Sequence, residues 1–325
     1  MASKEKRPLE PWRWDERPRV LLIGNGFNRT YHMKSWKNLI ESVRKKEGVD
    51  PELLHRLPLS MQVVLATGNQ VGDSMEEVAR YMRSFRLTEA HRELLERILD
   101  IPARTILTTN YSYELEKVFS GDCGTWKSNP YRLYAVPYKS TSSVKFLHRY
   151  SHVDRGDDYR NIWHIHGEVD MPSQIIMGHY YYGKMEYQMQ SYIPGLLRRY
   201  RYAASSGGLI RPRSWIDYYL MGDVYIAGFG LDLSEADIWY LACCKNRHFP
   251  WARTVYYTPV SASGKKDLKD EEKAMMEAYG IEVREREIAD AGEDRYGVFY
   301  RSVLEEIAAV FSGEGKLVPV ERTTP

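Results

Sequence analysis

Three short apolar segments, each followed at once by glycine or by small polar residues, constrain the fold more than any other feature of this sequence. Val20–Ile23 leads into Gly24–Asn28, Ile106–Leu107 leads into Thr108-Thr109-Asn110, and Asp223–Ala227 leads into Gly228–Gly230. In open parallel α/β sheets, ligands bind in the crevice outside the carboxyl ends of the strands. The sequence therefore predicts a Rossmann-like parallel sheet whose three polar strand ends meet at one crevice.

A fourth segment, Ile162–Gly167, reads Ile-Trp-His-Ile-His-Gly and supplies groups that titrate near neutral pH. His164 and His166 lie two apart on a predicted strand, so their side chains are expected to share one face. Such a pair could bind a metal, but no cysteine or carboxylate follows at ligand spacing, so we expect no metal site. Gly167 leaves room for a substrate beside His166. We therefore favour His166 as the group that does the chemistry. His164 is its neighbour, and a purely structural hydrogen bond to a backbone group could equally explain its presence.

Composition limits the classes of protein that fit. The 325 residues are 43% apolar, which is enough for a large core. With 46 basic and 44 acidic residues, the charge gives no general preference for nucleic acid. Cys123, Cys243 and Cys244 are too few for a disulfide framework, and the adjacent pair is expected to be buried in the core. No signal peptide or bilayer-length apolar run is visible, so the sequence predicts a cytoplasmic protein without a membrane partner.

The chain divides into four parts by composition. Residues 1–17 are predicted to be a flexible arm, residues 18–312 a single α/β domain with helices on both faces of the sheet, and residues 313–325 a tail. Residues 121–160, rich in Tyr, Pro, Ser, Lys and Arg, are predicted to be a smaller β-rich insertion. The insertion could be a lid over the crevice or an assembly surface.

Hydrophobic periodicity and glycine punctuation predict the individual elements. Helices are predicted at 35–43, 75–99, 185–204, 234–246, 267–279 and 296–311, with Ser35 and Ser234 as N-caps. Strands are predicted at 20–23, 104–109, 131–136, 144–147, 161–166, 175–177, 223–227, 253–257 and 281–288. The first two long strands are joined through helices, which predicts that they pair in parallel.

The two glycine elbows are candidates for binding a nucleotide. A tight turn after a buried strand lets the backbone approach a phosphate, but the first elbow lacks the third glycine of the dinucleotide fingerprint. Such turns also need glycine for conformational reasons alone. The helix after the second elbow is predicted to begin at about Ser234, and a helix N-terminus suits an anion. Asp237 lies one turn in, where its carboxylate could help cap the helix or reach a ribose hydroxyl. The residues expected to contact the nucleotide are Gly24, Asn25, Gly26, Phe27, Asn28, Thr109, Tyr111, Gly228, Phe229, Gly230 and Asp237.

A basic and aromatic cluster lies at Arg198–Tyr202 and Arg211–Arg213. Such a cluster could hold phosphates or nucleic acid. A charge run on a helix is more often a solvated face or a subunit contact, so nucleic acid is not favoured as a partner.

Taken in order, these motifs resemble the sirtuin-like superfamily. The resemblance is closest to its bacterial antiphage branch, the abortive-infection proteins with a Gly-Asn-Gly-Phe motif. It covers roughly residues 19–245 through short motifs whose order and spacing agree. The matching residues are Gly24–Asn28, Trp36, Thr108–Tyr111, Leu115-Glu116, His164–Gly167, Gly228–Leu231, Ser234 and Asp237.

The resemblance implies a Rossmann-like fold that binds NAD and an enzyme that cleaves the nicotinamide–ribose bond, without a metal. It implies that Asn110 positions a water or a ribose hydroxyl and that His166 is the general base. Ser112 stands where many relatives carry aspartate, which could alter hydrogen bonding beneath the ribose. The four zinc-binding cysteines of protein-deacetylating sirtuins are absent, which favours plain NAD hydrolysis to nicotinamide and ADP-ribose.

An enzyme that depletes NAD is lethal to its cell, so it must be silent until triggered. We therefore expect a homo-oligomer that responds to a phage-derived trigger or partner protein. Two alternatives stay open. The protein could be a non-catalytic sensor of NAD or ADP-ribose, or an effector directed to RNA or DNA through the segment 198–213. Hydrolysis could also compete with cyclisation or ADP-ribosyl transfer.

Overall fold

The computed structural model describes residues 9–31, 35–44, 50, 54, 56–68, 71–83, 87–121, 132–135, 145–155, 157–292 and 294–313. The rest of the predicted arm, most of the predicted insertion between residues 121 and 145, and nearly all of the predicted tail lie outside these residues. Cys123 also lies outside them.

An eight-stranded sheet forms the centre of the molecule, in the order β10-β9-β8-β2-β3-β6-β5-β4. Its strands are β2 (Arg19–Ile23), β3 (Thr105–Thr108), β4 (Arg132–Tyr134), β5 (Arg149–Arg155), β6 (Asp158–His164), β8 (Asp223–Ala227), β9 (Thr254–Ser261) and β10 (Ile281–Ile288). The six strands from β10 to β6 are parallel, and β5 and β4 continue the sheet in antiparallel fashion. The predicted α/β class and the predicted parallel pair β2–β3 are confirmed.

The order of the strands reverses at β2. From β2 the chain moves outward through β3 to β6, and it then returns to place β8 on the other side of β2. The pairs Ile23–Thr108 and Ile23–Ala227 show that β2, β3 and β8 end level with one another. A reversal of this kind leaves a crevice at the carboxyl ends of the central strands, which is where doubly wound folds bind ligands.

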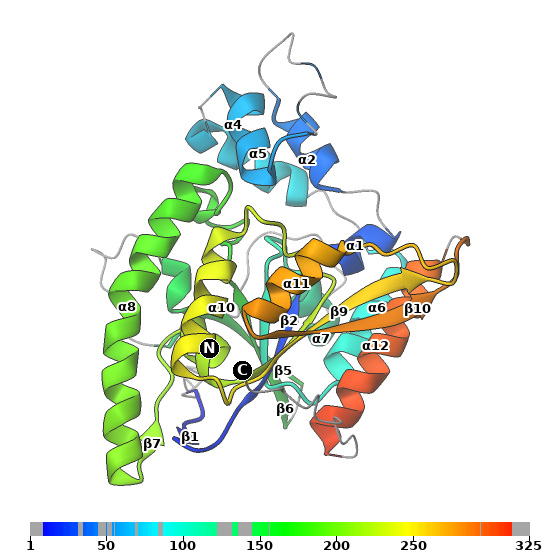
Figure 1. The fold of residues 1–325 in the computed structure, drawn as a ribbon. Coiled ribbons are helices and arrows are strands. Elements are labelled where there is room, and N and C mark those ends of the chain that lie inside the picture. Colours follow the sequence, from blue (N-terminus) through cyan, green and yellow to red (C-terminus); the bar gives the residue numbers. More distant parts are fainter. Residues whose placement is uncertain are drawn as a thin grey trace.

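Helices cover both faces of the sheet and one end of it (Figure 1). They are α1 (Gly26–Tyr31), α2 (Trp36–Ser42), α4 (Leu59–Thr67), α5 (Val71–Arg83), α6 (Glu89–Asp100), α7 (Glu114–Ser120), α8 (His179–Ser206), α9 (Trp215–Met221), α10 (Ala236–His248), α11 (Asp270–Ala278) and α12 (Arg295–Ser312). Within β2, Val20 and Leu22 belong to the apolar cluster that includes α8, α9 and α10, while Leu21 and Ile23 belong to the cluster with α6 and α12. Because successive side chains of a strand point to opposite faces, one apolar run supports both layers.

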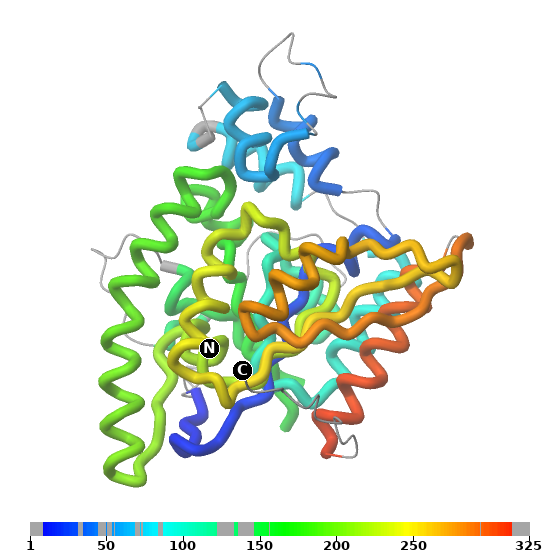
Figure 2. Tube along the Cα trace, in the orientation of Figure 1, coloured from blue at the N-terminus to red at the C-terminus, as the bar shows by residue number. Residues whose placement is uncertain are grey.

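The helices α2, α4 and α5 form a separate cap, which lies beyond the end of the sheet in Figures 1 and 2. Their apolar side chains form a third cluster with Tyr113, Val169 and Ile175 of the main body. The side chain of Arg83 on α5 also donates a hydrogen bond to the carbonyl of Val169. Ser35 caps α2 as predicted, because its hydroxyl accepts a hydrogen bond from the backbone N–H of Asn38 at 3.3 Å.

Several predicted elements differ from the structure. The helix predicted at 75–99 is two helices, because Thr88 caps a new helix, α6. The helix predicted to begin at 185 begins at His179. The strand predicted at 144–147 contains instead a 3-10 turn, η1 (Lys145–Leu147), and residues 175–177 are buried but pair with no strand within the described chain. The last two segments are short apolar pieces, for which tertiary packing decides the conformation.

Two predictions of exposure are also wrong. The predicted arm packs against the domain from Leu9 onward, because Leu9 and Trp12 are buried and β1 (Trp12–Arg13) pairs with β7 (Leu209–Ile210). On α10, Cys243 is exposed and Cys244 only half-buried, so this pair is not part of the core. Among the described residues, no helix combines the length and the apolar character that crossing a bilayer requires.

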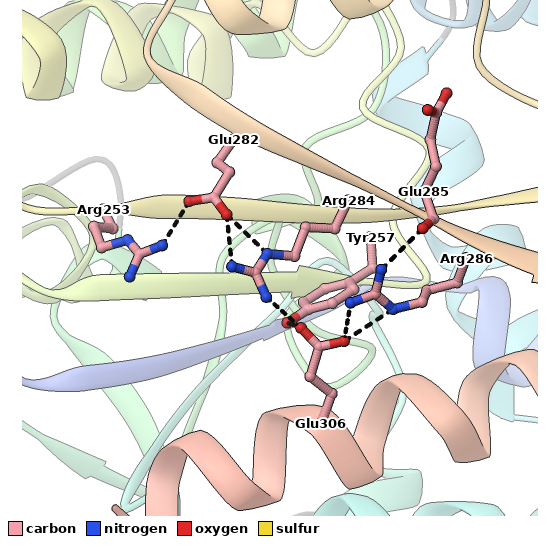
Figure 3. A network of polar contacts seen from close by, with 7 residues as sticks. All are labelled: Arg253, Tyr257, Glu282, Arg284, Glu285, Arg286 and Glu306. Atoms are coloured by element: carbon pink, nitrogen blue, oxygen red, sulfur yellow. Dashed lines mark hydrogen bonds and ion pairs between the residues drawn. The ribbon is translucent and has the colours of Figure 1, made fainter. Parts of the chain in front are cut away.

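Charged side chains join the edge of the sheet to α12 (Figure 3). Glu306 on α12 accepts hydrogen bonds from the guanidinium groups of Arg284 and Arg286 and from the hydroxyl of Tyr257, the last at 3.0 Å. Glu282 joins Arg253 to Arg284 in the same network. Burial alone would raise the pKa of Glu306, but the hydrogen bonds from Arg286 and Arg284 lower it.

Replacing Glu306 with glutamine is expected to lower the free energy of unfolding by about 1–3 kcal/mol at neutral pH, because two half-buried guanidinium groups lose their charged acceptor. Because the pKa of Glu306 is lower in the folded than in the unfolded protein, this stabilisation is fully present at pH values above the unfolded pKa of about 4.3. The stabilisation is lost as the pH falls through the pKa of the folded protein. Urea denaturation of both proteins measures the difference. Glu305→Gln is the matched control, because the neighbouring side chain is 73% exposed and should change stability little.

Candidate active site

A cavity of about 810 Å³ lies over the carboxyl ends of β2, β3 and β8. Its floor is formed by the residues that follow these strands, namely Asn25, Gly26, Thr109, Asn110, Tyr111, Gly228, Phe229 and Gly230. The cap contributes Trp36, Leu39, Leu59, Tyr81 and Met82. This volume lies within the range of small-molecule sites, which is roughly 300–1,000 Å³. The predicted crevice is therefore present, and the helical cap forms one of its walls.

The cavity continues toward β9, α11 and α12. There it is lined by apolar and aromatic side chains and by charged side chains of both signs. The apolar and aromatic ones include Tyr256, Leu268, Met276 and Tyr300, and the charged ones are Arg29, Lys265, Lys266, Asp267 and Glu272. The opposite end contains His166, Tyr182 and Glu235. A ligand that fills the cavity would therefore meet an acidic group at one end and side chains of both charges at the other.

Two backbone hydrogen bonds join the two glycine elbows to each other. The N–H of Gly24 donates to the carbonyl of Ala227 at 3.0 Å, and the N–H of Gly26 donates to the carbonyl of Gly228 at 2.6 Å. A Cβ atom on Gly24 would lie 2.4 Å from that same Gly228 oxygen. The N–H groups of Gly24 and Gly26 thus already have backbone acceptors. The glycines here permit the close approach of two loops.

Phe27 and Asn28 do not line the cavity but support the elbow from below. The ring of Phe27 stacks on Tyr300, with 4.2 Å between centroids. Buried Asn28 accepts a hydrogen bond from His91 Nε2 at 2.9 Å and donates to Asn25 Oδ1 at 3.2 Å. Among the predicted contact residues, Phe27 and Asn28 therefore act indirectly, through the residues above them.

Asn110 follows β3 and is held by its backbone. Its N–H donates to Thr108 Oγ1 at 3.1 Å, and its carbonyl accepts from His164 Nδ1 at 2.6 Å. The side-chain oxygen Oδ1 is buried and has no hydrogen-bond partner among the described residues. Buried polar atoms are rarely left unpaired, so we expect a water molecule or a ligand in the cavity to supply the donor. Its neighbours Thr109 and Tyr111 also line the cavity.

His164 is a charged positioning residue. Its Nε2 donates to Glu116 Oε1 at 2.8 Å, while Nδ1 donates to the carbonyl of Asn110. Burial alone would lower the pKa of His164, but Glu116 outweighs that effect and raises the pKa to about 9. Both ring nitrogens of this imidazolium are engaged in hydrogen bonds, so neither is available for proton transfer. The role of His164 is therefore to hold the backbone of Asn110 in place.

His166 lies in the turn after β6 and contacts two carboxylates. Its Nε2 is 3.0 Å from Asp237 Oδ2 and 3.7 Å from Glu235 Oε2. Burial alone would lower the pKa of His166, but Asp237 and Glu235 raise it to about 8. The hydroxyl of Tyr182 donates to Glu235 Oε2 at 2.7 Å. Burial, together with the charge of Asp237, raises the pKa of Glu235.

Three expectations about this region are wrong. His164 and His166 do not share a strand face, because β6 ends at His164 and the two imidazoles have different partners. Ser234 does not cap α10, since the N-cap residue is Glu235. Asp237 neither caps α10 nor lines the cavity; it is fully buried behind His166 and bonds to its ring.

Glu235 and Tyr182 are the site residues that sequence reasoning missed. Glu235 is next to the predicted cap residue, and an acidic residue at a helix start has an ordinary explanation. Tyr182 lies in the first turn of α8, before the predicted start of that helix. Their contact with His166 joins segments that are distant in sequence, and no local pattern reports it.

The basic cluster on α8 is partly structural. Arg199 binds the buried carboxylate of Asp217 through two hydrogen bonds of 2.9 Å and also donates to Tyr192. Arg198 and Arg201 are exposed. Arg211 and Arg213 are exposed as well, so only Arg199 of the cluster is taken up in a buried ion pair.

Comparison with protein-family models finds no match for this chain, and comparison with curated proteins finds none either. The fold and the cavity alone define its class. It is an α/β protein with a Rossmann-like sheet and a ligand-sized cavity at the point where the strand order reverses.

Proposed function

We propose that the protein binds NAD⁺ in this cavity and cleaves its nicotinamide–ribose bond, releasing nicotinamide and ADP-ribose. The observation that carries the proposal is that Asn110 and His166, which follow different strands, line one cavity. Asn110 adds an unpaired amide oxygen, and two carboxylates beside His166 tune its pKa. A perturbed imidazole in a cleft with convergent polar groups is characteristic of a catalytic site. The order of the short motifs supports the same reaction.

The chemistry needs few groups. Cleavage builds an oxocarbenium-like ribose and expels nicotinamide with the electron pair of the broken bond, so no acid is required. Asn110 holds the attacking water or a ribose hydroxyl. His166 accepts the proton of the water as its oxygen bonds to the ribose carbon. Asp237 keeps the Nε2–H of His166 oriented, which leaves Nδ1 as the proton acceptor, and it stabilises the imidazolium that forms.

The charges along the cavity favour one orientation of the dinucleotide. The cationic nicotinamide ring and the developing ribose cation fit the end that contains Glu235. The diphosphate and adenosine fit the other end, where Arg29, Lys265 and Lys266 lie among aromatic and apolar side chains and outnumber the carboxylates of Asp267 and Glu272. In this orientation the ribose lies between Asn110 and His166.

The rate of NAD⁺ cleavage is expected to depend on pH through His166. Its neutral form is the base, and its pKa is raised to about 8. The value of kcat/KM should therefore rise about tenfold per pH unit below pH 8 and level off above it. Asp237→Asn removes a charge that raises this pKa, so the midpoint should move to lower pH. A profile that is flat between about pH 6 and 9 would contradict His166 as the base.

Product analysis separates this proposal from its rivals. Purified protein is incubated with NAD⁺ and the products are identified by chromatography. Nicotinamide with ADP-ribose supports hydrolysis, whereas a cyclised product keeps the site and changes the outcome. Binding of NAD⁺ without release of nicotinamide would favour a non-catalytic sensor. Because free NAD⁺ consumption would kill the cell, we propose a silent resting state, in a homo-oligomer of antiphage defence that a phage component activates.

A further inference from the structure

Two carboxylates and one imidazole form a compact cluster at the acidic end of the cavity. Ligand atoms of His166, Glu235 and Asp237 all lie within 4.8 Å of one another. Two contacts already approach the spacing of atoms around one metal ion, since His166 Nε2 lies 3.0 Å from Asp237 Oδ2 and 3.7 Å from Glu235 Oε2. Ions such as Zn²⁺ are bound by imidazole nitrogen and carboxylate oxygen at about 2.0–2.2 Å.

The charge of the cluster is not balanced by the protein. A protonated His166 neutralises only one of the two carboxylates. No lysine or arginine forms an ion pair with Glu235 or Asp237 within the described part of the chain. Two carboxylates that share one buried site repel each other. A divalent cation would remove this repulsion.

A second observation points independently to a ligand. The remaining oxygen of Asp237, Oδ1, is buried and has no hydrogen-bond partner among the described residues, and Asp237 is fully buried. Tyr182 donates to Glu235 at 2.7 Å, which is the kind of outer hydrogen bond that orients a ligating carboxylate. The cavity beside Glu235 leaves space for a water molecule as a further ligand.

The geometry points to a binding site for a divalent transition-metal ion of the Zn²⁺ class, formed by His166, Glu235 and Asp237. The ion replaces the proton on His166 Nε2. The neutral imidazole then carries its single proton on Nδ1, the nitrogen that the proposed cleavage uses as acceptor. Metal binding therefore silences the base without closing the cavity; this consequence, unlike the binding itself, rests on the proposed function.

The experiment titrates the full-length chain, freed of metal with a chelator, with ZnCl₂ in an isothermal calorimeter. We expect one saturable site per chain. Asp237→Asn should weaken Zn²⁺ binding at least about 100-fold, and Tyr182→Phe, which removes only the outer hydrogen bond, about 10-fold. Glu235→Gln is a second ligand variant at a less buried position, for use if Asp237→Asn does not fold by circular dichroism. His248→Gln, at the far end of α10, is the control and should bind as the parent does.

The outcomes distinguish the two proposals. No saturable binding, or equal affinity in the parent and the ligand variants, would overturn the metal site. Nicotinamide release is measured in parallel, with and without one equivalent of Zn²⁺, and loss of turnover on addition supports silencing. If Zn²⁺ binds but the metal-free protein never releases nicotinamide, the metal site stands and the proposed function fails. If NAD⁺ is cleaved and Zn²⁺ does not bind, the reverse holds.

Discussion

Replacing His166 with alanine is expected to reduce nicotinamide release by about 10²- to 10⁴-fold, the range that a positioned general base contributes. NAD⁺ binding should change much less, because the rest of the cavity, from the cap helices to the elbows after β2 and β8, remains in place. Single-turnover rates and equilibrium titration with NAD⁺ measure the two effects separately. Asn110→Ala should also slow the reaction, because the attacking water or ribose hydroxyl loses its amide partner.

The control for this prediction is His248→Ala, which removes an imidazole from the opposite end of α10 and should leave the rate unchanged. Circular dichroism and thermal unfolding show whether the variants stay folded. If the His166→Ala and Asn110→Ala proteins both release nicotinamide at the parental rate, the mechanism is wrong. A loss of NAD⁺ binding equal to the loss of rate would assign His166 to binding rather than to proton transfer.

Replacing Gly228 with alanine is expected to lower the free energy of unfolding by about 2–4 kcal/mol. Its φ of +68° lies in the left-handed region, and an added Cβ would lie 2.5 Å from the ring of Phe27. Either the ring or the second elbow must move, so the bond that joins Gly228 to the N–H of Gly26 is strained as well. Chemical denaturation measures the loss of stability.

Gly230→Ala is the matched control, two residues further along the same loop. A Cβ atom at Gly230 meets no heavy atom within 4 Å, so this variant should stay within about 0.5 kcal/mol of the parent. Equal destabilisation by the two substitutions would mean that the elbows are not fastened as described. Gly228→Ala should also weaken NAD⁺ binding, since its loop forms part of the cavity floor.

Much of the central sheet could be predicted from sequence, because its strands are apolar runs that end at glycine or polar residues. The predicted strands 223–227 and 281–288 coincide with β8 and β10. Short pieces were predicted less well. Residues 175–177 are as apolar as a strand, yet they pack under the cap, and Ile176 bonds through its N–H to the carbonyl of His166. The sequence of this segment does not indicate that its hydrogen-bond partner is His166.

The position of the site could be predicted because parallel strands deliver their polar ends to one edge of the sheet. Asn110 and His166 do line one cavity. The hydrogen bonds between the residues of the site could not be predicted. Asp237 was expected at a ribose or a helix cap, whereas it bonds to His166, and Gly24 was expected at a phosphate, whereas it bonds to Ala227. These contacts depend on how α10 and β8 approach the first half of the chain.

Strand β8 is central in the sheet but late in the chain, and this matters while the protein is being made. A nascent polypeptide that has reached the end of α9 already contains Asn110 and His166. It still lacks the strand that must lie beside β2, the elbow that fastens Gly26, and the carboxylate that orients His166. We therefore expect a chain that stops at the end of α9 to lack an assembled site and, under the proposed function, to leave NAD⁺ intact.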